Sequence, residues 1–138
     1  MENFFDVYRN LGIDNLDILA EIYSEEIIFI DPAHKISGLA QLKNYFEKLY
    51  SDLDSIEFDF LHHQRQGDVV YVQWRMVMSH PRLRKGSPVT VDGLSRLELD
   101  ADEKVKLHRD YFDLGEMLYE NLPLIGMVVT SIKKRLGQ

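Results

Sequence analysis

Hydrophobic residues at the start of the chain recur at helical spacing. Phe4, Tyr8 and Leu11 fall at i, i+4 and i+7, so they predict a helix that ends at Gly12. Apolar residues resume at three- and four-residue spacing across residues 14–23, behind an aspartate that suits a helix N-cap. The opening of the chain therefore predicts two short helices in succession.

A short strand and a third helix are predicted next. Isoleucine and phenylalanine fill residues 27–30, which is typical of a buried strand, and the Asp31-Pro32 step ends it. From Gly38 to Leu53, leucine and phenylalanine again recur three and four residues apart. This stripe predicts an amphipathic helix of some four turns.

After Asp54 the apolar period changes to two and predicts four long strands. The side chains expected to face the core are Ile56, Phe58, Phe60 and His62 in the first strand; Val70, Val72, Trp74, Met76, Met78 and His80 in the second; Val89, Val91, Gly93, Ser95, Leu97 and Leu99 in the third; and Val105, Leu107, Arg109, Tyr111 and Asp113 in the fourth. Residues 114–136 then predict a helix interrupted at Pro123 and Gly126.

This order of elements predicts one α+β domain over residues 1–138. The N-terminal helices would cover one face of a strongly curved, cone-shaped antiparallel sheet, and such a sheet encloses a cavity. Polar residues interrupt the predicted inner faces near one end: His62, His80, Ser95, Arg109 and Asp113. A charge at a core-facing position is costly unless it is paired, so these residues either satisfy one another or line a pocket.

Composition narrows the classes of function. The 138 residues carry a formal net charge of −7, which argues against a nucleic-acid partner, and no apolar run is long enough for a membrane span. The chain has no cysteine, so thiolate chemistry is excluded and a cytoplasmic location is expected. His62 and His63 would point to opposite faces of a strand, and no metal site is expected from them.

The segment from Ile27 to Pro32, followed by Gly38 at a helix start, resembles the nuclear transport factor 2-like superfamily. That superfamily, which shares the cystatin-like architecture, includes ketosteroid isomerases, SnoaL-type polyketide cyclases and limonene epoxide hydrolase. The resemblance covers nearly the whole chain and implies a cone-shaped α+β barrel, often dimeric through the outer face of its sheet. It also implies proton-transfer chemistry without a cofactor, and no dinucleotide or phosphate-loop glycine pattern is present.

The steroid isomerase pattern implies specific roles for individual residues. Asp31 matches the general base before a proline, and Tyr8 falls close to the tyrosine that donates to the developing oxyanion. Ser95 stands where that site has a protonated aspartic acid, and a serine hydroxyl is a weaker donor, which argues against steroid isomerisation itself. By analogy with the epoxide hydrolase, Arg109 and Asp113 could meet Asp31 around one water.

Each of these residues also has a structural interpretation. Asp31 could simply end a strand, Tyr8 could be a core residue, and Arg109 with Asp113 could form a buried ion pair. The leading hypothesis is nevertheless an isomerase, cyclase or hydrolase acting on a lipophilic compound. Its predicted catalytic residues are Asp31, Tyr8, Arg109 and Asp113, and its predicted ligand-binding residues are Phe58, Phe60, Trp74, Met76, Met78, His80, Ser95 and Tyr111.

A second hypothesis is a non-catalytic domain that binds a ligand or pairs with another chain. Tyr71, Gln73, Arg75 and Val77 would lie on the outward side of a central strand, where their mixed character suits an interface between two copies of the chain. The two hypotheses differ in the cavity, because an enzyme needs converging polar groups around open space. A homodimer through the outer sheet face is compatible with both.

Overall fold

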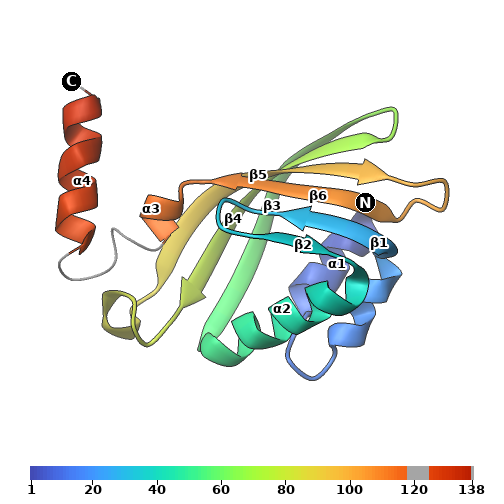
Figure 1. The fold of residues 1–138 in the computed structure, drawn as a ribbon, viewed down its shortest axis with the longest axis horizontal. Helices are drawn as coiled ribbons and strands as arrows, with labels where there is room; N and C mark the ends of the chain where they lie inside the picture. The colour runs from blue at the N-terminus through green and yellow to red at the C-terminus, as the bar shows by residue number, and fades with distance from the viewer. Residues whose placement is uncertain (118–124, 138) are drawn as a thin grey trace.

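The computed structural model describes residues 1–117 and 125–137, and these form an α+β fold around one six-stranded sheet (Figure 1). The strands are β1 (Tyr23–Ile30), β2 (Lys35–Ser37), β3 (Ser55–Gln66), β4 (Val69–Ser79), β5 (Val89–Leu99) and β6 (Val105–Phe112). Their order across the sheet is β2-β1-β6-β5-β4-β3. Neighbouring strands are antiparallel except β1 and β6, which run parallel. The predicted α+β class is confirmed.

The helices near the N-terminus cover one face of the curved, unclosed sheet (Figure 1). The helical segments are α1 (Glu2–Asn10), the 3-10 turn η1 (Leu16–Glu21), α2 (Leu39–Asp52), the 3-10 turn η2 (Arg84–Gly86), α3 (Leu114–Met117) and α4 (Ile125–Leu136). None of the helices within the described residues is both long and apolar enough to cross a membrane. The main core lies between the inner sheet face and the α1 and α2 helices.

The two N-terminal α-helices bury their apolar stripes as the sequence predicts. In α1 the buried side chains are those of Phe4, Phe5, Val7 and Tyr8. Gly38 precedes α2 with a φ of 92°, a conformation that side-chain-bearing residues rarely adopt, and its N–H donates to the Ile27 carbonyl over 2.7 Å. This turn fixes where the chain leaves β2 and begins the helix.

The alternation predicted for β4 and β5 is confirmed. Five side chains of β4 and five of β5 are buried on the inner face: Val70, Val72, Trp74, Met76, Met78, Val89, Val91, Ser95, Leu97 and Leu99. Gly93 occupies the remaining inner position of β5, opposite Trp74. These two unbroken strands supply the floor of the cavity described below.

The predictions for the first third of the chain need three corrections. The second helix is only the short turn η1, and Tyr23, placed on that helix from its spacing, instead begins β1. The strand β1 therefore starts four residues before the predicted Ile27. A further short strand, β2, pairs with β1, so that the segment after Pro32 continues the sheet edge. Tyr23 is 1% exposed, so it is buried as its place in the apolar stripe predicts, but it lies in a strand.

Two β-bulges overturn the predicted faces of β3 and β6. In β3 the register shifts between Phe60 and His62, so His63, whose ring lies 5.2 Å from that of Phe5, faces the helices in place of His62. In β6 the register shifts beside Leu99, and from His108 onward the opposite set of residues faces inward. One extra residue in a strand exchanges its two faces, which is why an alternation read through a bulge fails.

The C-terminal prediction is met in part. A helical segment resumes at Leu114 as α3, and α4 begins at Ile125, so Gly126 lies within α4 and is not the predicted break. The predicted break at Pro123 lies outside the described residues. An ion pair joins Lys133 of α4 to Asp113 at the end of β6.

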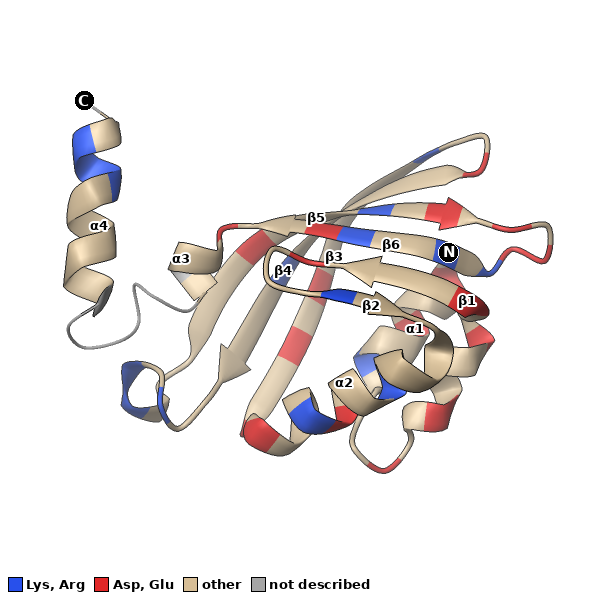
Figure 2. Ribbon diagram, in the orientation of Figure 1, with Lys and Arg blue, Asp and Glu red and all other residues tan. Residues whose placement is uncertain are grey.

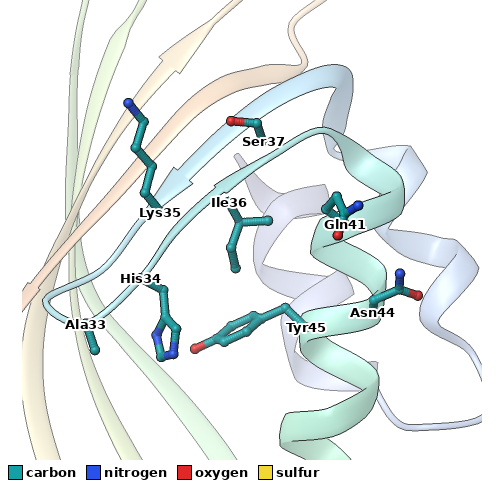
Figure 3. Close-up of a pocket in the computed structure, with 8 residues that line it drawn as sticks. All are labelled: Ala33, His34, Lys35, Ile36, Ser37, Gln41, Asn44 and Tyr45. Carbon is teal, nitrogen blue, oxygen red and sulfur yellow. The ribbon is translucent and has the colours of Figure 1, made fainter.

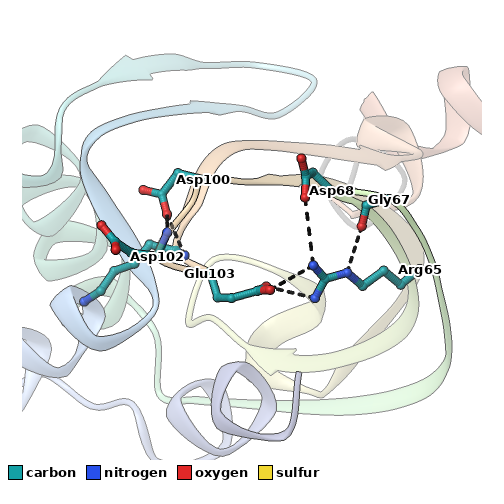
Figure 4. A network of polar contacts seen from close by, with 7 residues as sticks. Arg65, Gly67, Asp68, Asp100, Asp102 and Glu103 are labelled. Atoms are coloured by element: carbon teal, nitrogen blue, oxygen red, sulfur yellow. Dashed lines mark hydrogen bonds and ion pairs between the residues drawn. The ribbon is translucent and has the colours of Figure 1, made fainter.

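Charged residues gather at the ends of the sheet. Basic residues mark the η2 loop and the last turn of α4, whereas acidic residues mark the β5–β6 turn (Figure 2). At that acidic turn the Arg65 guanidinium donates to both Glu103 carboxylate oxygens, over 2.8 and 3.0 Å, and to the Gly67 carbonyl over 2.9 Å (Figure 4). The ion pair raises the pKa of Arg65 and lowers that of Glu103. It ties the β3–β4 and β5–β6 turns together at the surface.

Candidate functional site

A cavity of about 230 Å³ lies between the inner sheet face and the helices. Aromatic and aliphatic side chains make up most of its wall: Phe4, Phe29, Phe46, Leu49, Leu53, Ile56, Phe58, Phe60, Val72, Trp74, Met76, Met78, Leu83, Phe112, Leu114 and Met117. A smaller group of polar residues also lines it: Tyr8, Asp31, His34, Tyr45, His80, Ser95, His108 and Asp110. Few polar groups in a mainly apolar enclosure are typical of a small-molecule site.

Most residues predicted for the site do line this cavity. Asp31 and Tyr8, two of the four predicted catalytic residues, lie in its wall. The predicted ligand-binding residues found there are Phe58, Phe60, Trp74, Met76, Met78, His80 and Ser95. The alternation of β3 before its bulge, and of β4 and β5 throughout, places these side chains on one face.

A chain of hydrogen bonds crosses one wall of the cavity. The Tyr8 hydroxyl lies 2.5 Å from the Tyr23 hydroxyl, which lies 2.6 Å from Nδ1 of His108. On the other side of the imidazole, Nε2 of His108 lies 2.6 Å from Oδ1 of Asp110. Four side chains from α1, β1 and β6 are thus connected in series. Three of them, Tyr8, Tyr23 and His108, are at most 7% exposed.

The Asp110 carboxylate determines which atom donates and which accepts in each of these hydrogen bonds. Because an ionised Asp110 only accepts hydrogen bonds, Nε2 of His108 donates to it. In a neutral imidazole Nδ1 then accepts from Tyr23, which in turn accepts from Tyr8. Burial raises the pKa of both tyrosines well above the ordinary value, and the Asp110 charge raises them further, so both remain protonated.

Asp110 holds its two oxygens in different environments. Oδ1 accepts from His108 and from the Ser95 hydroxyl, which itself accepts from the Trp74 indole N–H over 2.8 Å. Within residues 1–117 and 125–137, no group of the protein donates to Oδ2. The Asp110 side chain is 16% exposed and lines the cavity. It therefore offers one anchored and one available carboxylate oxygen.

Asp31 stands at a second polar position and is more fully occupied. Its Oδ1 accepts from the backbone N–H of Ala33 and of His34, over 2.8 and 2.7 Å, and lies 3.0 Å from Nδ1 of His34. Its Oδ2 accepts from the Tyr45 hydroxyl over 3.0 Å. Burial first, and then the Asp31 charge, raise the pKa of Tyr45. The backbone bonds form a turn that ends β1, as the structural interpretation of an Asp-Pro step predicts.

A shallow groove borders the cavity on its Asp31 side. Its lining consists of residues 33–37 together with Gln41, Asn44 and Tyr45. Figure 3 shows the His34 and Tyr45 side chains side by side, and their ring centroids are 5.0 Å apart. Ala33, His34 and Tyr45 line both the groove and the cavity, so they form the wall between the two.

Three predicted site residues lie away from the cavity. Arg109 and Tyr111 are exposed on the other face of β6, with the guanidinium 5.0 Å from the Tyr111 ring centroid. Asp113 follows the end of β6 and pairs with Lys133. The prediction that Arg109 and Asp113 meet Asp31 in the cavity is therefore wrong, because the bulge in β6 turns His108 and Asp110 inward in their place.

Comparison with protein-family models matches residues 2–108 to a SnoaL-like domain. The match covers far more than half of the chain. This protein belongs to the SnoaL-like family. The comparison with curated protein sequences gives no match.

Solved structures share the fold of this SnoaL-like protein. A Catenulispora acidiphila protein with a ketosteroid isomerase-like fold, solved in complex with trimethylamine, has a TM-score of 0.73 and 17% identity, covering 85% of this chain and 88% of that one. A Jannaschia protein assigned as a SnoaL-like polyketide cyclase has a TM-score of 0.69 and 20% identity, with 82% and 84% coverage. An Exiguobacterium protein of unknown function, described as NTF2-like, also has a TM-score of 0.69 and 20% identity, with 82% and 97% coverage.

Sequence reasoning missed four polar residues that line this SnoaL-like cavity: His34, Tyr45, His108 and Asp110. It also missed Tyr23, which is hydrogen-bonded to Tyr8 and His108. The string His108-Arg109-Asp110 is visible in the sequence, yet an uninterrupted alternation places both His108 and Asp110 outside. Tyr45 lies three residues after Leu42, on the inner side of α2, where a tyrosine is usually a core residue. The one usable signal was that His108 and Asp110 share a strand face with each other whichever way that face points.

Proposed function

We propose that this SnoaL-like protein is an enzyme that transfers protons on a small lipophilic compound without a cofactor, with Asp110 as its general base. The observation that carries the proposal is that Asp110 lines a mainly apolar cavity with Oδ1 held by two donors and Oδ2 available. Such a carboxylate is oriented and partly desolvated, which are the properties a general base needs.

The neighbouring groups support the same chemistry. When Oδ2 accepts a proton from a substrate carbon or hydroxyl, the donors on Oδ1 hold the carboxyl group in place. His108, which accepts from Tyr23 and donates to Oδ1, fixes the orientation of the carboxyl group. Asp31 is the alternative base implied by the family resemblance, and it lines the same cavity. Tyr8 and Tyr45 are candidate donors to the charge that develops on the substrate.

A base-sensitive probe can decide between the two carboxylates. In 5-nitrobenzisoxazole a base removes the C3 proton while the N–O bond breaks, giving a coloured cyanophenolate, and no other substrate group is required. We expect wild-type protein to open the ring faster than buffer, Asp110→Asn to lose at least about tenfold of that rate, and Asp31→Asn to stay within about threefold. Thermal melting verifies that each variant is folded.

The opposite pattern would assign the base to Asp31, as the family resemblance implies. Equal rates for wild type and both variants would overturn the enzyme proposal and favour a non-catalytic binding domain. The exposed variant Asp59→Asn on β3 is the matched control, because it removes the same charge from the outer face.

We also propose that two copies of the chain pair through the outer sheet face. Leu61, Leu94 and Tyr111 are 45%, 38% and 47% exposed. Gln73, Leu94 and Tyr111 are register partners across β4, β5 and β6, and Leu61 lies in the β3 bulge beside His62, the partner of Gln73. Such exposed apolar side chains are typical of interfaces. Four charged side chains of this face form two ion pairs, Arg75 with Asp92 and Arg96 with Glu98, which lowers the net charge that a second acidic chain meets there.

A further inference from the structure

The cavity lining combines two aspartates with three histidines, His34, His80 and His108. Asp31 and Asp110 contribute carboxylates, and no lysine or arginine lines the cavity within the described part of the chain. The two aspartate side chains are 7% and 16% exposed, so solvent and salt screen them weakly. A compound entering the cavity meets a potential that disfavours anions and favours positive charge.

The two carboxylates differ in what they still lack. Asp31 accepts hydrogen bonds from two backbone N–H groups and from the Tyr45 hydroxyl, and its Oδ1 also lies 3.0 Å from Nδ1 of the His34 ring. Asp110 has both of its protein partners on Oδ1, and Oδ2 receives no donor from the residues that the structure describes. A carboxylate oxygen in an apolar enclosure is stabilised most by a donor that is itself charged.

The walls around that oxygen suit an organic cation. Tyr8, Phe58, Phe60 and Trp74 line the cavity together with Asp110, and the Phe58 and Trp74 ring centroids are 6.4 Å apart at an angle of 81°. The faces of aromatic rings carry negative potential and attract ammonium groups, most strongly where water is excluded. Aromatic rings and one carboxylate can therefore replace much of the hydration that a cationic amine loses.

We infer that the ligand of this cavity is a small organic cation, a protonated or alkylated amine on a hydrocarbon group, with its nitrogen beside Oδ2 of Asp110. The inference rests on the proposed function, because it names the substrate class of the same cavity. An apolar cavity of about 150 Å³ holds benzene. By simple proportion, the 230 Å³ found here encloses about nine non-hydrogen atoms.

Two isosteric compounds isolate the charge from the shape. Phenyltrimethylammonium and tert-butylbenzene have the same non-hydrogen framework, and only the former is charged. Trp74 is the chain's single tryptophan and lines the cavity, so its fluorescence reports binding of either compound to the full chain at pH 8. We expect the cation to bind at least about tenfold more tightly than the neutral isostere.

Two aspartate variants test which carboxylate causes the preference for the cation. Asp110→Asn should reduce the preference to about threefold or less while leaving the affinity for tert-butylbenzene nearly unchanged, because the ring walls are intact. Asp59→Asn, on the outer face of β3, should retain the wild-type preference. A preference that survives in Asp110→Asn would overturn the assignment of the nitrogen to Asp110.

The outcomes separate this inference from the proposed function. Equal or tighter binding of tert-butylbenzene would overturn the cationic ligand while leaving a lipophilic site and the base reaction in place. If the wild-type protein prefers the cation but does not open 5-nitrobenzisoxazole faster than buffer, the enzyme proposal is overturned and the proposed ligand class stands. Binding of neither compound, measured up to millimolar concentration, would overturn the inference, and the rate with 5-nitrobenzisoxazole would still test the enzyme separately.

Discussion

Single atoms limit what the cavity wall can tolerate, most clearly at Gly93. A Cβ atom placed there would lie 2.3 Å from the Trp74 ring, far inside normal contact distance. We expect Gly93→Ala to destabilise the fold by about 1–3 kcal/mol, because the ring must move within a packed wall. Urea unfolding followed by fluorescence measures this cost. Gly12→Ala is the control, since its Cβ would lie 3.8 Å from the nearest atom, and equal stabilities would contradict the packing argument.

The buried tyrosines predict how stability depends on alkaline pH. Burial raises the pKa of Tyr8 and Tyr23 in the folded protein, whereas in the unfolded chain they titrate near about 10. The folded state then binds more protons than the unfolded state above that pH. Each tyrosine therefore contributes stability that is complete below pH 10 and is lost above it by about 1.4 kcal/mol per pH unit.

Urea unfolding between pH 9 and pH 11 measures how steeply the free energy of unfolding falls with pH. Tyr23→Phe should make this fall shallower by about 1.4 kcal/mol per pH unit, the contribution of one tyrosine. Tyr111→Phe is the matched control, because Tyr111 is 47% exposed. A slope equally steep in Tyr23→Phe and wild type would show that Tyr23 does not resist ionisation. The same variant removes the hydrogen bond to Nδ1 of His108, so a lower base-reaction rate in it would support the role of this residue series in orienting Asp110.

At the scale of whole elements, an unbroken hydrophobic pattern predicted structure well and a bulged one did not. The stripes of α1 and α2 and the alternation of β4 and β5 have no irregularity, and they placed Tyr8, Trp74 and Ser95 correctly on the cavity side. A bulge depends on how two strands pair, which the spacing within one strand does not contain. The sequence predicted half of the polar cavity residues, and the bulge accounts for the two missed in β6, His108 and Asp110.

The face of β6 can be tested with two neighbouring residues. His108 is buried and hydrogen-bonded at both ring nitrogens, whereas Arg109 is exposed. We expect His108→Ala to cost about 2–4 kcal/mol, since it leaves a cavity and removes partners from Tyr23 and Asp110. Arg109→Ala should change stability by less than about 0.5 kcal/mol. Chemical denaturation of both variants tests the assignment, and a larger cost at Arg109 would restore the unbroken alternation.

For the molecule as a whole, the family match explains the fold more completely than the chemistry. The solved relatives have at most 20% identity among those described, so they share the arrangement of sheet and helices and not a demonstrated reaction. This structure describes the Asp110 and Asp31 carboxylates and the aromatic cavity wall for this protein alone. Their chemistry therefore has to be tested on this protein.

The outer sheet face supplies the whole-molecule prediction. Leu94 lies directly opposite Tyr111 in the β5–β6 register and opposite Gln73 in the β4–β5 register. If two copies pair there, wild-type protein sediments as a dimer at micromolar concentrations and Leu94→Glu sediments as a monomer, because the new charge would lose its hydration at the interface. The residue points away from the cavity side, so the monomeric variant should keep the cation preference and the base reaction.

Ile13→Glu is the matched control, since Ile13 is 47% exposed and precedes η1, away from the sheet. It introduces the same charge in place of a similar apolar side chain, and it should remain dimeric. A monomeric wild type, or a dimeric Leu94→Glu, would contradict pairing through this face. Loss of the base reaction in a folded Leu94→Glu monomer would instead show that the cavity depends on the second copy.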